Sequence, residues 1–265
     1  MVDIARNWPR RIQKRLTEEK PRLRELRDRV VDLLYPPRCL ACPEPTETPM
    51  GLCGSCWREV QFLAGSVCDL CGDPVPTADG QEDRVLCEGC TADPPGWDRG
   101  RAAVAYEGVG RRVVLSLKHG DRLDLTATLA RWMVGAGAAI IEPDMLIVPV
   151  PLHWRRLMAR RYNQSAELAR AVAHRTRNPI CTDLLVRPRA TSPQQGLSRT
   201  ERRDNQRGAI IVNPRRAERA KETSVLLIDD VMTSGATLAA ATEALRVSGA
   251  QDVHVLTLAR VAQGR

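Results

Sequence analysis

One stretch near the carboxyl end, residues 225–237, restricts the fold more than any other part of the chain. It reads Val-Leu-Leu-Ile-Asp-Asp-Val-Met-Thr-Ser-Gly-Ala-Thr. The four leading aliphatic residues are a run short enough for a strand that is buried on both faces. Two carboxylates and a small-residue loop follow, and a helical pattern then runs from Leu238 to a predicted glycine cap at Gly249. This order predicts an α/β fold with a ligand site at the carboxyl edge of a parallel sheet.

The loop in this stretch has the chemistry of a phosphate site. Gly235 lets the backbone approach a ligand, and the amides at a helix N-terminus carry partial positive charge. Hydroxyl groups are offered by Thr233, Ser234 and Thr237. Together these groups can hold a phosphate dianion.

The acidic pair calls for a different part of the ligand. Asp229 and Asp230 cannot bind the phosphate, but they can accept hydrogen bonds from sugar hydroxyls or hold a divalent ion. A sugar phosphate satisfies both halves of the stretch. The absence of Gly-Lys-Ser/Thr excludes a Walker-type nucleotide loop. The alternative explanation is an ordinary strand-to-helix turn capped by Asp and Ser/Thr side chains.

The stretch resembles the 5-phosphoribosyl 1-diphosphate (PRPP) binding motif of type I phosphoribosyltransferases. The resemblance implies that Asp229 and Asp230 serve the ribose 2- and 3-hydroxyls, while Thr233 through Thr237 wrap the 5-phosphate. The full ligand-binding motif it implies is Asp229, Asp230, Val231, Met232, Thr233, Ser234, Gly235, Ala236 and Thr237. Purine-salvage members carry a third Asp where this chain has Thr233, which argues against hypoxanthine or guanine salvage.

Eight of the nine cysteines form four Cys-x-x-Cys turns: Cys39 and Cys42, Cys53 and Cys56, Cys68 and Cys71, Cys87 and Cys90. Each turn points two thiolates at one place, and two turns complete a tetrahedral site, so the spacing predicts two structural Zn²⁺ ions. Disulfides or redox motifs are alternatives that the short spacers and the fourfold repetition disfavour. Both sequential and interleaved pairing of the turns fit the spacing. Cys181 has no partner turn and is expected to be a small buried side chain.

Charge and composition indicate the kind of ligand and the cellular location that suit this chain. The 265 residues carry a net charge of +8, which suits phosphate-bearing ligands or nucleic acid, although a solvated basic surface would explain it equally well. No apolar run approaches a membrane span and no signal-peptide core is present, so we expect a cytoplasmic protein. We divide the chain into a basic extension with an amphipathic helix (1–36), a double zinc ribbon (37–96) and a phosphoribosyltransferase-like domain (97–265).

The last region reads as alternating strands and helices. Strands are expected at 101–106, 144–151, 209–212 and 253–258, and helices at 109–117, 123–141 and 165–175. Residues 184–209 look structureless, and their arginines and hydroxyls suit a lid over an anionic ligand.

Several basic residues are candidates for binding the pyrophosphate of PRPP together with Mg²⁺. They are Lys118, Arg160, Arg161, Arg187 and Arg189. If the domain is catalytic, Arg187 and Arg189 would stabilise the leaving pyrophosphate while Asp229 and Asp230 fix the ribose. No residue is an evident base for an acceptor.

Further motifs resemble the ComF family of competence-associated proteins, which join a zinc ribbon to a phosphoribosyltransferase-like domain. They are the Cys-x-x-Cys turns, Tyr106-Glu107-Gly108, Leu117-Lys118, Pro149-Val150-Pro151-Leu152, Arg161-Tyr162-Asn163-Gln164 and the Pro193-to-Asn205 segment. His119 departs from the pattern, and residues 1–32 lie outside it.

This resemblance implies a phosphoribosyltransferase-type parallel sheet with an N-terminal zinc-ribbon module. It also implies binding of PRPP or a related ligand, and a part in uptake or handling of single-stranded DNA during natural transformation. Other competence proteins, such as the uptake helicase, would be further partners. An active phosphoribosyltransferase of nucleotide metabolism and a PRPP-sensing regulator are the alternative functions.

Overall fold

A computed structural model describes most of the chain from residue 36 onward. The described stretches are residues 36–46, 50–76, 84–119, 122–153, 158, 162–189 and 208–262. The predicted N-terminal extension and helix lie outside them, apart from residue 36, as does most of the predicted lid. The chain divides into two compact units, residues 1–53 and 54–265.

The described part of the first unit is a tight turn that holds the first Cys-x-x-Cys pair. Arg38 and Pro45 form an isolated antiparallel bridge. Between them, the Cys39 N–H donates to the Glu44 carbonyl at 2.8 Å. This hydrogen bond closes the turn around the cysteines.

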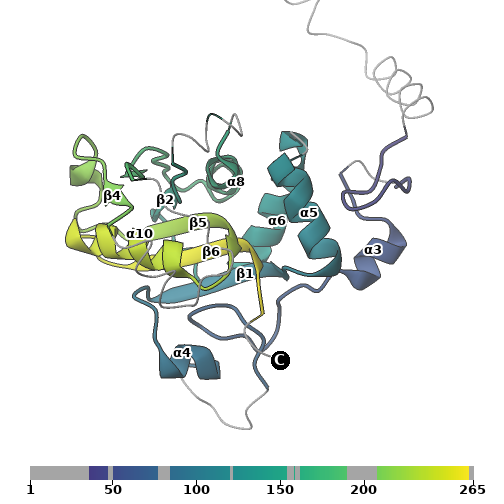
Figure 1. The fold of residues 1–265 in the computed structure, drawn as a ribbon, viewed down its shortest axis with the longest axis horizontal. Helices are drawn as coiled ribbons and strands as arrows, with labels where there is room; N and C mark the ends of the chain where they lie inside the picture. The colour runs from purple at the N-terminus through teal and green to yellow at the C-terminus, as the bar shows by residue number, and fades with distance from the viewer. Residues whose placement is uncertain are drawn as a thin grey trace, which may run out of the picture. The chain divides into compact units, whose positions relative to one another are not determined.

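The second unit is built on a four-stranded parallel sheet with the order β1-β6-β5-β2 (Figure 1). The strands are β1 (Arg99–Ala105), β2 (Leu146–Pro149), β5 (Val225–Met232) and β6 (Val253–Arg260). Every residue of β2 and β6 is buried. Continuous burial means that both faces are covered, which is why these strands read as apolar runs rather than alternating patterns.

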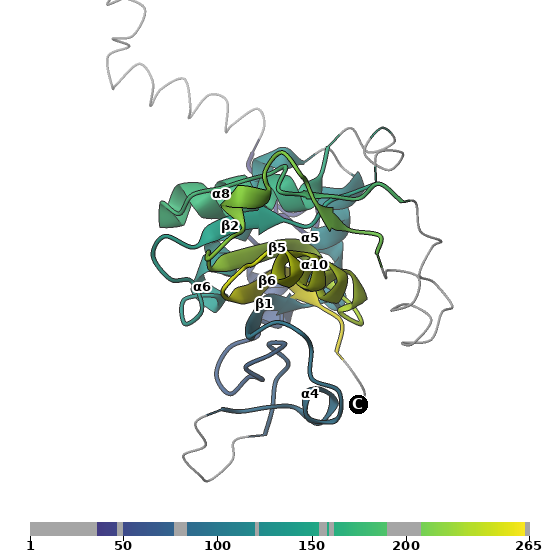
Figure 2. The same cartoon turned by 90° about the vertical axis from the view of Figure 1, so that its left-hand side faces the viewer.

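Helices cover the two faces of this sheet (Figure 2). The long ones are α5 (Gly108–His119), α6 (Thr126–Ala136), α8 (Gln164–Thr176) and α10 (Ala236–Val247). Leu238 and Ala241 of α10 share a hydrophobic cluster with Leu227 of β5 and Val255 of β6. Helices α6 and α8 pack against each other and cover the opposite face.

Shorter elements complete the unit. They are helices α3 (Gly54–Glu59) and α4 (Glu88–Ala92), single 3-10 turns at Leu123–Leu125 and Ala217–Arg219, and strands β3 (Leu185–Val186) and β4 (Ile211–Val212). β3 and β4 pair in antiparallel fashion, outside the main sheet. The predicted lid therefore begins as a strand rather than as loop.

Two other local predictions were wrong. The helix expected over 123–141 is a 3-10 turn followed by α6, which ends at Ala136. Gly135 and Gly137 explain the early end, because glycine is a poor helix former and the Gly137 N–H closes the last turn on Gly135 and Met133. The strand at 225 does not stop at the carboxylates but continues to Met232, because this stretch keeps pairing with β6.

Candidate functional site

The acidic pair lies within β5, close to the carboxyl edge of the sheet. Asp229 is in register with Thr257 of β6, and the preceding Ile228 is in register with Pro149, the last residue of β2. Because the three strands are parallel, their ends meet at one edge, where α/β proteins place their ligands. The acidic pair therefore lies at the edge of the sheet where the sequence predicts a ligand site.

Asp229 is held by two donors. The Ser165 hydroxyl donates to its Oδ1 at 2.8 Å, and the Asp230 backbone N–H donates to the same oxygen at 2.9 Å. Burial, and then the neighbouring charge of Asp230, raises the pKa of Asp229 to about 7, while the Ser165 hydrogen bond and Lys118 act in the opposite direction. Asp229 therefore changes its charge near neutral pH.

Asp230 has a cationic partner. Lys118 Nζ, in the last turn of α5, lies 3.2 Å from Asp230 Oδ2, and the two side chains are only 18% and 14% exposed. Low exposure strengthens the attraction compared with a surface pair. Lys118, which was a candidate for the pyrophosphate side, thus stands directly beside the acidic pair.

The segment before α8 joins this site to its neighbours. Tyr162 donates its hydroxyl proton to the Leu117 carbonyl at 2.7 Å, and Leu117 precedes Lys118. Asn163 caps α8 by accepting the Ser165 N–H, and its Nδ2 donates to the Val150 carbonyl just after β2. These hydrogen bonds hold Ser165 and the end of α5 next to the carboxyl edge of the sheet.

The loop that follows β5 leads directly into α10. Gly235 has φ 77°, a left-handed conformation that glycine adopts without strain, and α10 begins at the next residue. Thr233 is exposed, and Ser234 and Thr237 are half-buried. These hydroxyl groups therefore lie next to the N-terminus of the 12-residue helix α10, and the Ala236 N–H donates to Ser234 Oγ at 3.5 Å.

A cavity of about 540 Å³ opens next to the acidic pair's supporting residues. Its lining includes Tyr162, Asn163 and Ala166 of the α8 segment and Arg187 after β3. Arg187 is buried and Arg189 is exposed. Arg160 and Arg161 lie outside the described residues.

The eight paired cysteines form two groups. Cys39, Cys42, Cys53 and Cys56 make one, and Cys68, Cys71, Cys87 and Cys90 make the other, with the sulfurs of each group within 4.8 Å of one another. All nine cysteines are free thiols, and the ninth, Cys181, is buried as expected. The pairing left open by the spacing is therefore sequential.

Both groups have the chemistry of a zinc site. Sγ of Cys42 and Cys53 are 3.6 Å apart, as are those of Cys71 and Cys87. Zn–S bonds of about 2.3 Å in a tetrahedron require sulfurs roughly 3.8 Å apart. Hydrogen bonds among the sulfurs of the second group lower the pKa of Cys68 and raise those of Cys71 and Cys90, so these sulfurs titrate together.

Comparison with known proteins agrees with both halves of this arrangement. The Double zinc ribbon domain family matches residues 30–91, and the Phosphoribosyl transferase domain family matches residues 163–265. The DNA utilization protein YhgH of Salmonella typhimurium is 31% identical over 86% of this chain and 99% of its own length. Competence protein F of Haemophilus influenzae is 28% identical over 84% of this chain and 96% of its own. The chain belongs to the ComF family.

Among solved structures, the allosteric regulatory enzyme of purine biosynthesis overlaps 50% of the ComF-family chain, with 25% of its own chain covered. Its sequence identity is 20% and its TM-score 0.34. An overlap this loose adds nothing to the family match.

Two residues that contact the candidate site of this ComF-family chain were not predicted from the sequence. Ser165 was treated only as the start of a helix, although a serine in a first turn after an Asn cap was a usable signal. Trp97, whose indole packs against Gly235, gave no sequence signal, because 138 positions separate the two residues. None of the helices in the described stretches is long and apolar enough to cross a membrane.

Proposed function

We propose that this chain binds PRPP, or a related phosphoribosyl ligand, with Mg²⁺ at the carboxyl edge of β5. The observation that carries this proposal is the hydrogen-bonded acidic pair directly before a glycine turn and a helix N-terminus. The turn offers positive amides to a phosphate, and the carboxylates offer acceptors to vicinal hydroxyls. A phosphorylated pentose presents both groups at once.

The chain's own residues divide the work. Asp229, positioned by Ser165, accepts from one ribose hydroxyl, and Asp230 accepts from the other. Lys118 neutralises part of the charge of the pair and can turn toward the pyrophosphate. Arg187 would meet that group from the neighbouring cavity. The bound Mg²⁺ would supply charge neutralisation at the diphosphate, a role that oxygen ligands suit.

Calorimetric titration of Mg²⁺–PRPP into zinc-loaded protein tests this site. We expect the Asp229→Asn/Asp230→Asn double variant to lose at least about a hundredfold in affinity, because each hydrogen bond to a charged group contributes about 1.5–3 kcal/mol. Asp144→Asn is the matched control, since Asp144 is exposed and its φ of 63° suits asparagine equally well. Equal binding by the double variant and the wild type would refute the proposal.

We further propose that the protein handles single-stranded DNA during natural transformation, in the cytoplasm and together with competence proteins such as the uptake helicase. The names of its relatives, DNA utilization protein and competence protein F, and the net charge of +8 support this. Binding to the DNA backbone should weaken with salt at a slope of about −0.7 per phosphate contacted. An affinity that is independent of salt would count against DNA handling.

Catalysis is a second candidate function, because the 540 Å³ cavity lined by Tyr162, Asn163 and Arg187 has room for an acceptor. Pyrophosphate release from PRPP with a nucleobase or amine acceptor, abolished in the Asp229/Asp230 variant, would establish a phosphoribosyltransferase. PRPP binding without release with any acceptor tried would leave the binding role alone.

A further inference from the structure

Trp97 connects the second cysteine group to the phosphate loop. Its indole is 5% exposed, and Nε1 donates to the Leu70 carbonyl at 2.5 Å. Leu70 lies inside the Cys68–Cys71 turn. One edge of the indole is therefore bonded to the backbone that presents two of the four thiols.

The other edge of the same indole touches the glycine of the phosphate loop. A Cβ built on Gly235 would lie 2.9 Å from Cη2 of Trp97, closer than real Cβ contacts allow. Gly235 is the residue whose left-handed φ turns β5 into α10. The indole thus forms a wall behind the turn that is proposed to bind the phosphate.

A second connection runs through Arg260, at the end of β6. Its Nε lies 3.3 Å from Asp73 Oδ1, just after the Cys68–Cys71 turn, and its Nη1 lies 2.8 Å from Met232 Sδ. Arg260 is 2% exposed, so these contacts are shielded from water. Met232 is the last residue before the loop. The loop is therefore buttressed at its start by Arg260 and at its glycine by Trp97.

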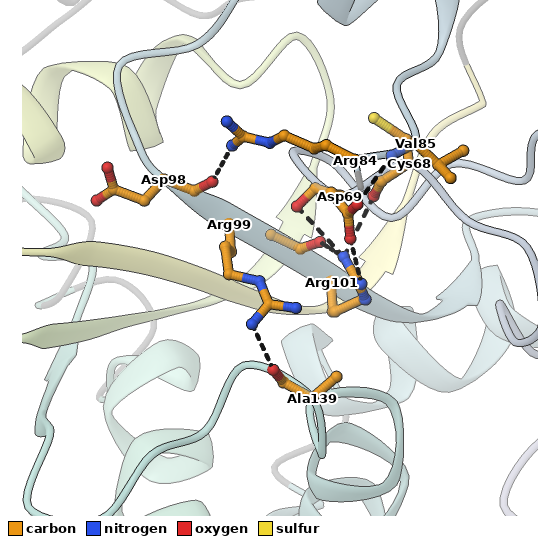
Figure 3. Close-up of polar contacts among 9 residues, drawn as sticks. Cys68, Asp69, Arg84, Val85, Asp98, Arg99, Arg101 and Ala139 are labelled. Atoms are coloured by element: carbon orange, nitrogen blue, oxygen red, sulfur yellow. Dashed lines mark hydrogen bonds and ion pairs between the residues drawn. The ribbon is translucent and has the colours of Figure 1, made fainter. Parts of the chain in front are cut away.

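The Cys68–Cys71 turn is itself fastened to the sheet, as Figure 3 shows. Arg101 of β1 donates to Asp69 Oδ1 at 2.6 Å and to the Cys68 carbonyl at 3.4 Å. The Gly100 N–H donates to the Asp69 carbonyl at 2.7 Å. Because the turn cannot move freely against β1, its geometry is passed on to Trp97 and Arg260.

The hydrophobic core also joins the two features. Cys68, Leu70, Cys71 and Trp97 belong to the same buried cluster as Leu238, in the first turns of α10. The second cysteine group is thus packed into the core beneath the loop. A change in the turn would disturb that packing as well as the hydrogen bonds.

We propose that Trp97 is a positioning residue for the phosphate loop, and that metal at Cys68, Cys71, Cys87 and Cys90 is required for the loop to adopt its binding shape. The proposal rests on the proposed PRPP site. A four-cysteine metal and the bonds to β1 together fix the turn that leads to Leu70 and Asp73, so loss of the metal removes one of the two supports of both anchors of the loop. The second zinc ribbon is then a part of the ligand site and not only a structural module.

Trp97→Ala tests the first link, with Trp57→Ala as the matched control because Trp57 is 57% exposed and its ring packs against Phe62. We expect Trp97→Ala to weaken Mg²⁺–PRPP binding at least tenfold while zinc content stays equal to that of the wild type. Trp97→Phe keeps an aromatic ring and loses only the Nε1 donor and part of the side-chain volume, so we expect a smaller loss of Mg²⁺–PRPP affinity. This variant takes the place of Trp97→Ala if Trp97→Ala fails to fold. Wild-type affinity in both variants would overturn the role of Trp97.

Cys71→Ser tests the metal link, with Cys181→Ser as the control because Cys181 belongs to neither cysteine group. Amide hydrogen exchange over residues 232–238 is read by mass spectrometry without ligand, together with zinc content. We expect faster exchange in this segment for Cys71→Ser and for Trp97→Ala, and wild-type exchange for Cys181→Ser. Unchanged exchange after zinc loss would overturn the coupling. Absence of PRPP binding by the wild type would instead remove the proposed function, because the exchange result does not depend on a ligand.

Discussion

Gly235→Ala should destabilise the protein by a calculable amount. A left-handed φ costs a non-glycine residue about 1–2 kcal/mol. The new methyl group would also lie 2.9 Å from the Trp97 ring, and overpacking of this kind costs roughly 1–3 kcal/mol. We therefore expect a total loss of about 2–5 kcal/mol in the free energy of unfolding.

Gly65→Ala separates the two contributions. Gly65 has φ 81°, close to the 77° of Gly235, but nothing lies within 4 Å of its hypothetical Cβ. This variant should therefore pay only the backbone cost of about 1–2 kcal/mol. Combining Gly235→Ala with Trp97→Ala isolates the overpacking cost, because the clash between the new methyl group and the indole disappears when the indole is removed.

Urea unfolding of the single and double variants provides the measurement. A coupling energy of about 1–3 kcal/mol between the two substitutions is expected, since residues in direct contact are not additive. In thermal unfolding, each kcal/mol lost from the free energy of unfolding should lower Tm by roughly 2–4 °C for a chain of this size. If Gly235→Ala cost no more than Gly65→Ala, and the same amount with or without the indole, that result would falsify the contact as the reason for glycine at this position.

Four further predictions concern the acidic site and the segments that support it. The pKa of Asp229 is raised from 3.8 to about 7 in the folded chain, so the folded state retains a proton that the unfolded chain releases. Its contribution to the free energy of unfolding should therefore fall as pH rises from about 4 to about 7, and Asp229→Asn should flatten that dependence in urea titrations. Mg²⁺–PRPP affinity should rise over the same upper range, because the ionised carboxylate is the form that accepts from a hydroxyl; a flat pH profile would contradict this. Ser165→Ala removes a bond that favours ionisation, so the midpoint of that affinity profile should move to higher pH, and an unmoved midpoint would argue against the bond. Tyr162→Phe leaves the Leu117 carbonyl without its donor and should cost about 1–3 kcal/mol of stability by urea unfolding, whereas a cost near zero would mean that water replaces the hydroxyl.

Local patterns were enough for the elements whose signals are short-range. The strand at 225, its acidic pair and the helix after Gly235 were predicted from thirteen consecutive residues, because the run of apolar residues and the turn chemistry lie in one segment. The four Cys-x-x-Cys turns were also readable, since a two-residue spacer fixes the geometry of each pair. The end of the helix at Ala136 was missed because apolar content outweighed the two glycines in the pattern.

Spacing could not decide which turns share a metal, because sequential and interleaved pairing satisfy the same ligand chemistry. Only the fold brings Cys39 to Cys53 and Cys68 to Cys87 within metal-binding distance of each other. The environment of the acidic pair could not be predicted from the sequence either. The pKa of Asp229 depends on burial, on the hydroxyl of Ser165 in α8 and on the charges of Asp230 and of Lys118 in α5, and both helices are far away along the chain.

The sequence by itself determined which chemical groups this protein carries: an acidic pair, the small-residue loop that follows it and four Cys-x-x-Cys turns, each encoded within a few neighbouring residues. The tertiary structure decided how these parts act on one another. Lys118 meets Asp230 near the carboxyl edge of the sheet, and Trp97, which precedes β1, meets Gly235 through the buried cluster that it shares with α10. Such contacts arise from packing between elements, and no local preference of the chain records them.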